Sequence, residues 1–99
     1  MRLTEKQVQI IKSHFASIFD QNTTIHLFGS RTDDQKKGGD IDLLIKSNLK
    51  IEQPAKKCAE LVAKIQMSLG EQKIDVITID SDTILTPFHQ QALNEAIAL

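Results

Sequence analysis

Asp40 and Asp42 are the residues of this chain whose type and spacing point most directly to chemistry. They belong to the stretch DIDLLIK, which is rich in Ile and Leu and too short for a normal helix, so we expect a strand over residues 40–46. Alternate side chains of a strand share a face, which puts both carboxylates together, with Ile41 and Leu43 opposite. Adjacent carboxylates repel, and a divalent cation relieves that repulsion. Mg²⁺ suits the pair, because it commonly takes one or two carboxylates together with substrate phosphates.

Gly29 and Ser30 form a candidate phosphate-binding turn upstream of these aspartates. The apolar run over residues 25–28 predicts a strand that ends at Gly29, where the missing Cβ allows close backbone approach. The backbone N–H groups and the Ser30 hydroxyl at the start of a helical turn are suited to holding a phosphate. Three basic residues follow in the same connection: Arg31, Lys36 and Lys37. They fit a phosphate clamp or a solvated loop, and the sequence leaves both open.

Asp75 is a candidate third carboxylate. The β-branched, apolar stretch KIDVITI predicts a strand over residues 73–79, on which Asp75 shares a face with Ile77 and Ile79. If this strand lies beside the one over residues 40–46, Asp75 completes a two-metal site or acts as a base. The alternative is that Asp75 caps its strand or meets Lys73 at the surface.

Three helices are predicted to position these strands. The first covers about residues 4–19, with Thr4 and Gln7 as a capping box. The second covers residues 54–69, with a proline at its first position and Gly70 as its C-cap. The third opens at Thr86-Pro87. Its expected buried face consists of Phe88, Ala92, Leu93 and Ala96.

The predicted order is helix, strand, short helix or loop (residues 30–37), strand, helix, strand, helix, which indicates an α/β (α+β) fold. The connection between the first two strands is short for a parallel crossover, which needs about a dozen residues or more. We therefore expect a small mixed sheet flanked by helices, within a single domain over residues 1–99.

Composition excludes several classes of function. The net charge of −1 argues against binding nucleic acid through bulk charge, and four Phe with no Trp or Tyr argue against a base-stacking platform. The single cysteine, Cys58, excludes an internal disulfide and suits a reducing cytoplasm. The charged N-terminus does not resemble a signal peptide, and no stretch approaches the length of a membrane span.

Other chemistry finds less support. His14, His26 and His89 are far apart and lack metal-ligand spacing, so helix surface or strand packing is the expected role for each. Cys58 lies on the apolar face of the second predicted helix and is expected to be a core residue. A P-loop motif is absent from the sequence.

The combination of Gly29-Ser30, nine further residues and Asp40-Ile41-Asp42-Leu43 resembles the signature of the DNA polymerase β-type nucleotidyltransferases. The later Lys73-Ile74-Asp75-Val76-Ile77 is similar to the third-carboxylate strand of that superfamily. The resemblance covers roughly residues 24–79, and the short chain is similar to the minimal nucleotidyltransferases (MNT).

This resemblance implies specific roles. Asp40 and Asp42 would bind one or two Mg²⁺ ions, with Asp75 as third ligand or general base, and Gly29, Ser30 and Arg31 would contact the nucleotide phosphates. The implied reaction is transfer of a nucleoside monophosphate, AMP from ATP, with loss of pyrophosphate. The implied biology is that of an antitoxin paired with a helical HEPN toxin, and a partner subunit or a homodimer would complete so small a site.

A non-catalytic role is the alternative. A module of this size could neutralise its partner by contact alone, or bind nucleotide as a regulator without turning it over.

Overall fold

The two long helices begin and end where local sequence signals predict. The computed structural model describes residues 3–29 and 40–99. Helix α1 (Glu5–Ile18) follows Thr4, whose hydroxyl accepts a hydrogen bond from the Gln7 N–H (3.1 Å) while the Gln7 side chain accepts one from the Thr4 N–H (2.8 Å). Helix α2 (Pro54–Leu69) ends at Gly70, which has a φ of +88°. The predicted capping box and both predicted helices are confirmed.

The strands form one mixed sheet, as predicted. They are β1 (Thr23–Phe28), β2 (Ile41–Ser47), β3 (Ile74–Ile79) and β4 (Ile97–Ala98), in the spatial order β3-β2-β1-β4. β1 pairs antiparallel with β2 and β4, whereas β2 and β3 are parallel. The two-residue strand β4 is an addition to the predicted order.

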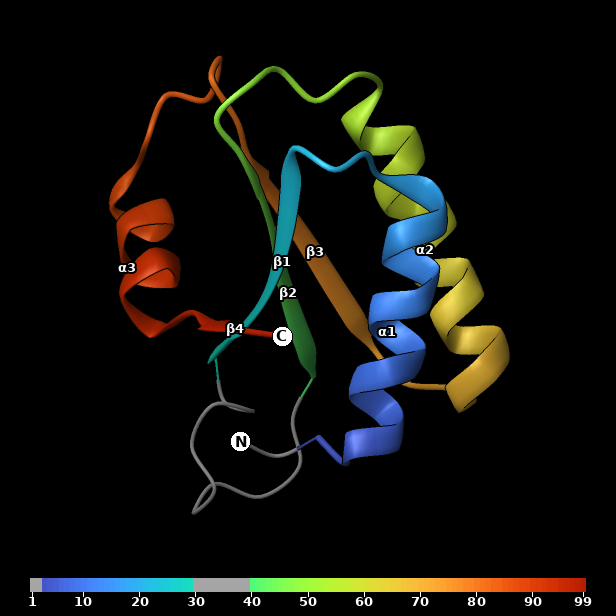
Figure 1. The fold of residues 1–99 in the computed structure, drawn as a ribbon. Coiled ribbons are helices and arrows are strands. Elements are labelled where there is room, and N and C mark those ends of the chain that lie inside the picture. Colours follow the sequence, from blue (N-terminus) through green and yellow to red (C-terminus); the bar gives the residue numbers. More distant parts are fainter. Residues whose placement is uncertain (1–2, 30–39) are drawn as a thin grey trace.

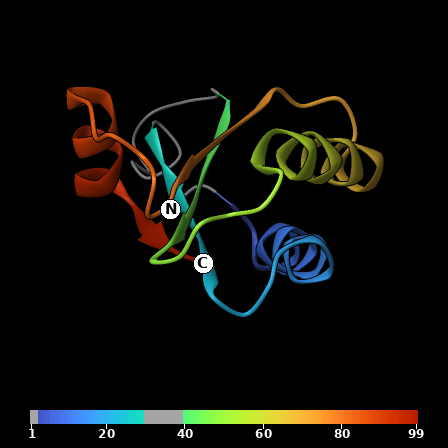
Figure 2. The same ribbon diagram turned by 90° about the horizontal axis from the view of Figure 1, so that it is seen from above.

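Helices cover both faces of the sheet (Figures 1 and 2). α1 and α2 lie side by side on one face, over the larger core, and α3 (Pro87–Glu95) lies on the other. Fully buried side chains of the larger core are Ile11, Leu27, Ile41, Leu43, Ile45, Leu61 and Ile65. The buried residues of the smaller core under α3 are Phe28, Leu44, Ile79 and Ala92.

One residue of the predicted buried face of α3 is exposed. Ala92 is buried, and Leu93 and Ala96 pack partly buried against the smaller core, as expected. Phe88, by contrast, is 55% exposed. It lies in the first turn of the helix, where its ring meets that of Phe28 edge-on at a centroid distance of 6.3 Å and that of His89 at 6.1 Å. The core under α3 is too small to cover this ring.

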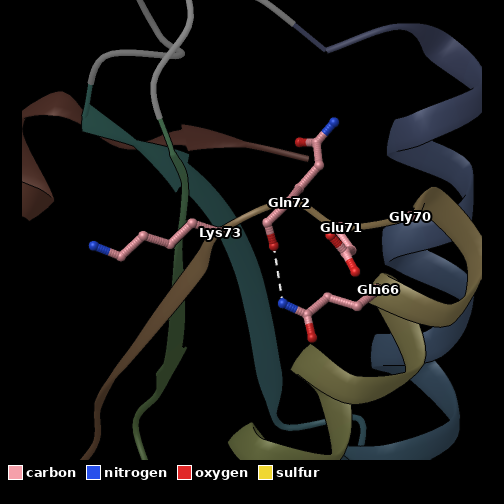
Figure 3. Close-up of a pocket in the computed structure, with 5 residues that line it drawn as sticks. All are labelled: Gln66, Gly70, Glu71, Gln72 and Lys73. Atoms are coloured by element: carbon pink, nitrogen blue, oxygen red, sulfur yellow. Dashed lines mark hydrogen bonds between the residues drawn. The ribbon is translucent and has the colours of Figure 1, made fainter.

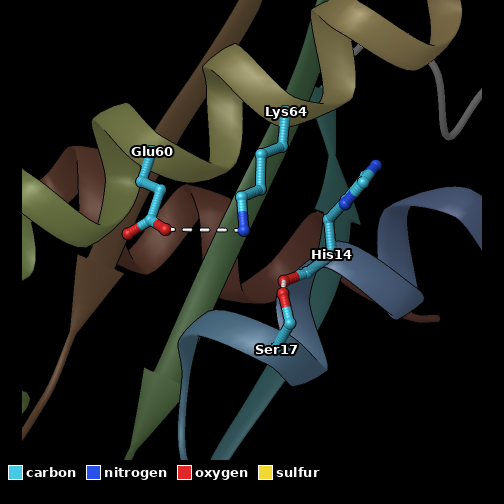
Figure 4. A network of polar contacts seen from close by, with 4 residues as sticks. All are labelled: His14, Ser17, Glu60 and Lys64. Atoms are coloured by element: carbon cyan, nitrogen blue, oxygen red, sulfur yellow. Dashed lines mark hydrogen bonds and ion pairs between the residues drawn. The ribbon is translucent and has the colours of Figure 1, made fainter.

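The outer surfaces of α1 and α2 carry ordinary polar contacts (Figure 4). Lys64 and Glu60 form an ion pair at 3.5 Å, and the Ser17 hydroxyl donates to the backbone oxygen of His14 at 2.8 Å. An exposed ion pair of this kind contributes little to stability, about 0–1 kcal/mol. Both side chains of the pair are exposed, so these contacts lie on solvated helix faces.

Residues 30–39 lie outside the described part of the chain. The short helix or loop predicted over residues 30–37, and with it Ser30 and Arg31, therefore stays a prediction. Within the described ranges, no helix has the length and apolar character to span a membrane.

Candidate active site

Three points of the chain meet at one edge of the sheet. β1 ends there at Phe28, while β2 and β3 both begin there. The antiparallel pairing of β1 with β2 places Phe28 opposite Asp42, and the parallel pairing of β2 with β3 places Asp42 opposite Asp75. Asp42 therefore sits between the end of β1 and Asp75.

Asp42 and Asp75 lie on the face of the sheet that α3 covers. Ile41 and Leu43, their alternates on β2, are fully buried in the core on the opposite face, as the alternation predicted. Further along β3, Ile77 and Ile79 pack in the smaller core under α3. The two carboxylates therefore lie at the margin of the smaller apolar core. The Asp42 side chain is half-buried and the Asp75 side chain is exposed.

Asp40 precedes β2 and is held by a different contact. Its Oδ2 lies 3.6 Å from the Nζ of Lys73, and the backbone oxygen of Lys73 accepts a hydrogen bond from the Ile41 N–H at 3.0 Å. The sequence had left open an ion pair between Lys73 and Asp75, but the ion pair found for Lys73 is with Asp40. Lys73 thereby supplies a positive charge beside the aspartates.

Gly29 is the residue that lets Asp42 approach the end of β1. Its φ is +77°, a conformation that side-chain-bearing residues rarely adopt. A Cβ at this position would collide with the Asp42 carboxylate. The close approach at Gly29 is thus made by the Asp42 carboxylate, and the approach of a phosphate to the Gly29 backbone stays a prediction.

The environment disfavours the charged form of Asp42. Partial burial raises the pKa of its carboxyl above the ordinary value of 3.8, and the neighbouring charges of Asp75 and Asp40 raise it further. Lys73 opposes this effect, while Glu95 adds to it more weakly. A cation at this edge would remove the conflict.

Glu95 is a member of this site that sequence reasoning missed. Its Oε2 accepts a hydrogen bond from the Gly29 N–H at 3.2 Å, although 66 positions separate the two residues. It is the last residue of α3, and the one local signal is that a carboxylate at a helix C-terminus opposes the helix dipole. Its place beside Gly29 depends on how α3 returns to the sheet.

The carboxylates fit a metal ion that is shared with a bound phosphate. Among residues 3–29 and 40–99, no group of three or more His, Cys, Asp or Glu side chains is arranged to hold a metal by itself. Asp42 and Asp75 nevertheless offer hard oxygens from adjacent strands. Mg²⁺ is usually bound by one or two carboxylates plus substrate phosphates, not by an all-protein cage. The donor set therefore suits a nucleotide-bound cation.

An open hollow of about 400 Å³ adjoins the start of β3 (Figure 3). It is lined by Gln66, Gly70, Glu71, Gln72 and Lys73. The Gln66 amide donates to the backbone oxygen of Gln72 at 2.9 Å, whereas the side chain of Lys73 points away from the other four. Lys73 belongs both to this hollow and to the aspartate edge.

The remaining reactive side chains have structural roles. Cys58 packs against the larger core, and burial raises the pKa of its thiol. His14 bonds the Ser68 hydroxyl at 2.9 Å, His26 bonds the Thr24 hydroxyl at 2.9 Å, and His89 completes the capping box of α3. None of these contacts forms a second reactive centre.

Comparison with known proteins identifies the class to which this chain belongs. The family model described as "nucleotidyltransferase domain" matches residues 5–98, nearly the whole chain. The chain therefore belongs to the nucleotidyltransferase domain family. No curated protein sequence matches it.

Two solved structures with this fold are toxin–antitoxin complexes. A chain of the crystal structure of a mutant MntA-HpeT toxin–antitoxin complex matches with a TM-score of 0.56 and 23% identity, over 98% of this chain and 71% of its own length. A chain from a re-refined structure of the tri-AMPylated Shewanella oneidensis HEPN toxin with its MNT antitoxin matches with a TM-score of 0.52 and 21% identity, over 94% of this chain and 65% of its own length. At these identities the likeness establishes the fold, and this chain spans about two thirds of the length of each neighbour.

Proposed function

We propose that this chain is a Mg²⁺-dependent nucleotidyltransferase that transfers AMP from ATP to a protein acceptor. The observation that carries the proposal is the register of β2 and β3, which pairs Asp42 with Asp75 beside the close approach of Gly29. Membership of the nucleotidyltransferase domain family supports it.

In this proposal, some residues at this edge of the sheet bind the metal and others bind the phosphates. Asp42 and Asp75 would hold Mg²⁺, with Asp40 joining them once its carboxylate leaves Lys73. When bound, the metal neutralises charge on the triphosphate and on the departing pyrophosphate. The resemblance assigns the β- and γ-phosphates to Gly29 and Ser30, and Arg31, the next residue in the sequence, is a further candidate for contacting them.

The transfer is an in-line displacement at the α-phosphorus. A bond forms between an acceptor hydroxyl oxygen and the α-phosphorus, and the bond from that phosphorus to the α,β-bridging oxygen breaks, so that pyrophosphate leaves with the electron pair. The hydroxyl proton passes to a base, and Asp75, the exposed carboxylate of the pair, is the candidate.

A HEPN-type toxin is the partner and acceptor that we propose. The support is that the two fold neighbours come from toxin–antitoxin complexes, one of them with a tri-AMPylated HEPN toxin. The chain also carries an exposed apolar patch before and at the start of α3, formed by Ile84 (87% exposed), Leu85 (45%) and Phe88 (55%). Clustered apolar side chains of this kind are typical of protein interfaces.

Neutralisation of the partner by contact alone is the second candidate. The observation that favours it is that the Gly29 N–H already donates to Glu95, so an internal carboxylate lies where a phosphate would bind. In that case the aspartate edge would be dispensable for neutralisation.

Substitution of the aspartates distinguishes AMP transfer from neutralisation by contact alone. The experiment incubates the purified chain and its partner with radiolabelled ATP and Mg²⁺, and compares the wild type with Asp40→Asn/Asp42→Asn. We expect label on the partner with the wild type alone, and loss of neutralisation in the double variant although it still binds the partner. Label transferred by the double variant would overturn the mechanism, and full neutralisation without any label would favour contact alone.

A further inference from the structure

The contact between Glu95 and Gly29 is built into the register of the sheet. β1 and β4 pair His26 with Ala98 and Leu27 with Ile97. Continuing the same antiparallel register by two residues brings Gly29 opposite Glu95, and the two are joined by the 3.2 Å hydrogen bond from the Gly29 N–H to Oε2. Pairing of β4 with β1 therefore holds the Glu95 backbone at this position.

Its surroundings make this an unfavourable place for a carboxylate. Glu95 ends α3, where the helix dipole disfavours negative charge, and it lies near enough to Asp42 for their charges to interact. Two hydrogen bonds offset these effects, one from the Gly29 N–H and one from the Gln91 side-chain amide to Oε1 at 3.2 Å. The carboxylate occupies the position because donors are there to receive an anion.

Release of the carboxylate requires only rotation of a side chain. Glu95 is exposed, so rotation about its own torsions carries Oε2 into water. The backbone on either side stays anchored, since the Ala96 N–H donates to Leu93 and the Leu99 N–H donates to Ile25. This rotation would break the hydrogen bond from the Gly29 N–H to Glu95 without any change in the pairing of β4 with β1.

We propose that Glu95 is a further residue of the nucleotide site, an internal anion that competes with the triphosphate of the nucleotide for the Gly29 N–H. The inference rests on the proposed function, because it takes this N–H to be a phosphate-binding group. The glutamate lowers the fraction of molecules that can accept the triphosphate, and the apparent affinity is reduced by that fraction. It thereby selects ligands with enough phosphate charge and bound cation to displace it.

The test measures binding of Mg²⁺–ATP and of Mg²⁺–tripolyphosphate by calorimetry. Glu95→Ala removes the carboxylate, and Glu95→Asp keeps the charge but shortens the side chain by one methylene, so that it no longer reaches Gly29. The control is Glu52→Ala, which removes an exposed glutamate in the loop after β2, at the far end of that strand.

We expect both Glu95 variants to bind each ligand roughly three- to tenfold more tightly than the wild type, as loss of one competing charged hydrogen bond predicts, and the control to match the wild type. Equal or weaker binding by both variants would overturn the inference, even where AMP transfer by the wild type upholds the proposed function. Tighter binding without any AMP transfer would reject the proposed reaction and support the inference. Absence of binding in all four proteins would reject both.

Discussion

Asp42 on β2 and Asp75 on β3 are direct partners in a parallel strand pair, so two carboxylates lie side by side on one face of the sheet. Each comes from a strand whose other face is buried against α1 and α2. A one-residue slip of either strand would turn its carboxylate into the core, which makes the pairing as well specified as the core itself.

Removing the charge of Asp42 should stabilise the metal-free protein at neutral pH. Because the pKa of this carboxyl is raised in the folded state, the folded protein binds more protons than the unfolded chain between pH 3.8 and the raised value. The wild type therefore loses stability as the pH rises through that window. Asp42→Asn should unfold with a free energy up to about 1 kcal/mol higher at pH 7, allowing for solvent screening, and converge with the wild type below pH 3.8. Denaturant titrations at several pH values in EDTA check this, and a variant less stable at pH 7 would contradict it.

Gly29 and Gly70 form a matched pair for testing the close approach to Asp42. Both have positive φ, but a Cβ at Gly29 would meet the Asp42 carboxylate, whereas one at Gly70 would meet no atom within 4 Å. Gly70→Ala should cost about 1–3 kcal/mol of backbone strain. Gly29→Ala should lower the free energy of unfolding by more than Gly70→Ala does. It should also weaken ATP binding, because the added Cβ displaces the Asp42 carboxylate. Thermal melts and ATP titrations measure both effects, and equal losses in the two variants would show that the approach is not tight.

Asp80 should stabilise the fold through hydrogen bonds at the end of β3. Its carboxylate accepts hydrogen bonds from the backbone N–H groups of Ile51 and Asp82 and from the Thr83 hydroxyl, and these bonds lower its pKa. A lowered pKa means that this stabilisation is present above pH 3.8 and is lost as the pH falls through the folded-state pKa. Asp80→Asn should cost about 1 kcal/mol at pH 7, or roughly 4–8 °C in Tm.

Asp82→Asn is the control for that measurement. The Asp82 side chain is exposed, so the Tm of the Asp82→Asn variant should stay near that of the wild type. Equal loss in the two variants would refute the assignment of the stabilising bonds to the Asp80 carboxylate.

The apolar patch at the start of α3 should be required for binding the partner. Ile84→Asp and Phe88→Asp should each weaken partner binding at least tenfold while leaving Tm within a few degrees, because both side chains are largely exposed. Met67→Asp, at an equally exposed position on α2, should bind normally. Unchanged binding in the Ile84 and Phe88 variants would exclude the patch as the interface.

Local signals made the helices and main strands predictable. The capping box of Thr4 and Gln7, Pro54 at the start of α2 and the C-cap Gly70 act on residues within one turn, and the helices begin and end there as expected. The strand face of Asp42 followed from alternation with Ile41 and Leu43, both fully buried.

Features that depend on distant packing were not predictable in the same way. β4 has two residues, too few for any periodicity, and it exists because Ile97 and Ala98 pair with β1. Phe88 has the helical spacing of a core residue, but the small core leaves it exposed. The contact of Glu95 with Gly29 has no sequence pattern, since it follows from β4.

The most direct test of the paired carboxylates is a calorimetric measurement of Mg²⁺–ATP binding. It compares the wild type with Asp42→Asn and Asp75→Asn, and Glu52→Gln serves as the charge control. We predict that the wild type and the control bind Mg²⁺–ATP with the same affinity. Each aspartate variant should bind it at least tenfold more weakly, because one of the two adjacent carboxylate ligands is gone. Wild-type affinity in both aspartate variants would contradict the assignment of the Asp42–Asp75 pair as the metal–nucleotide site.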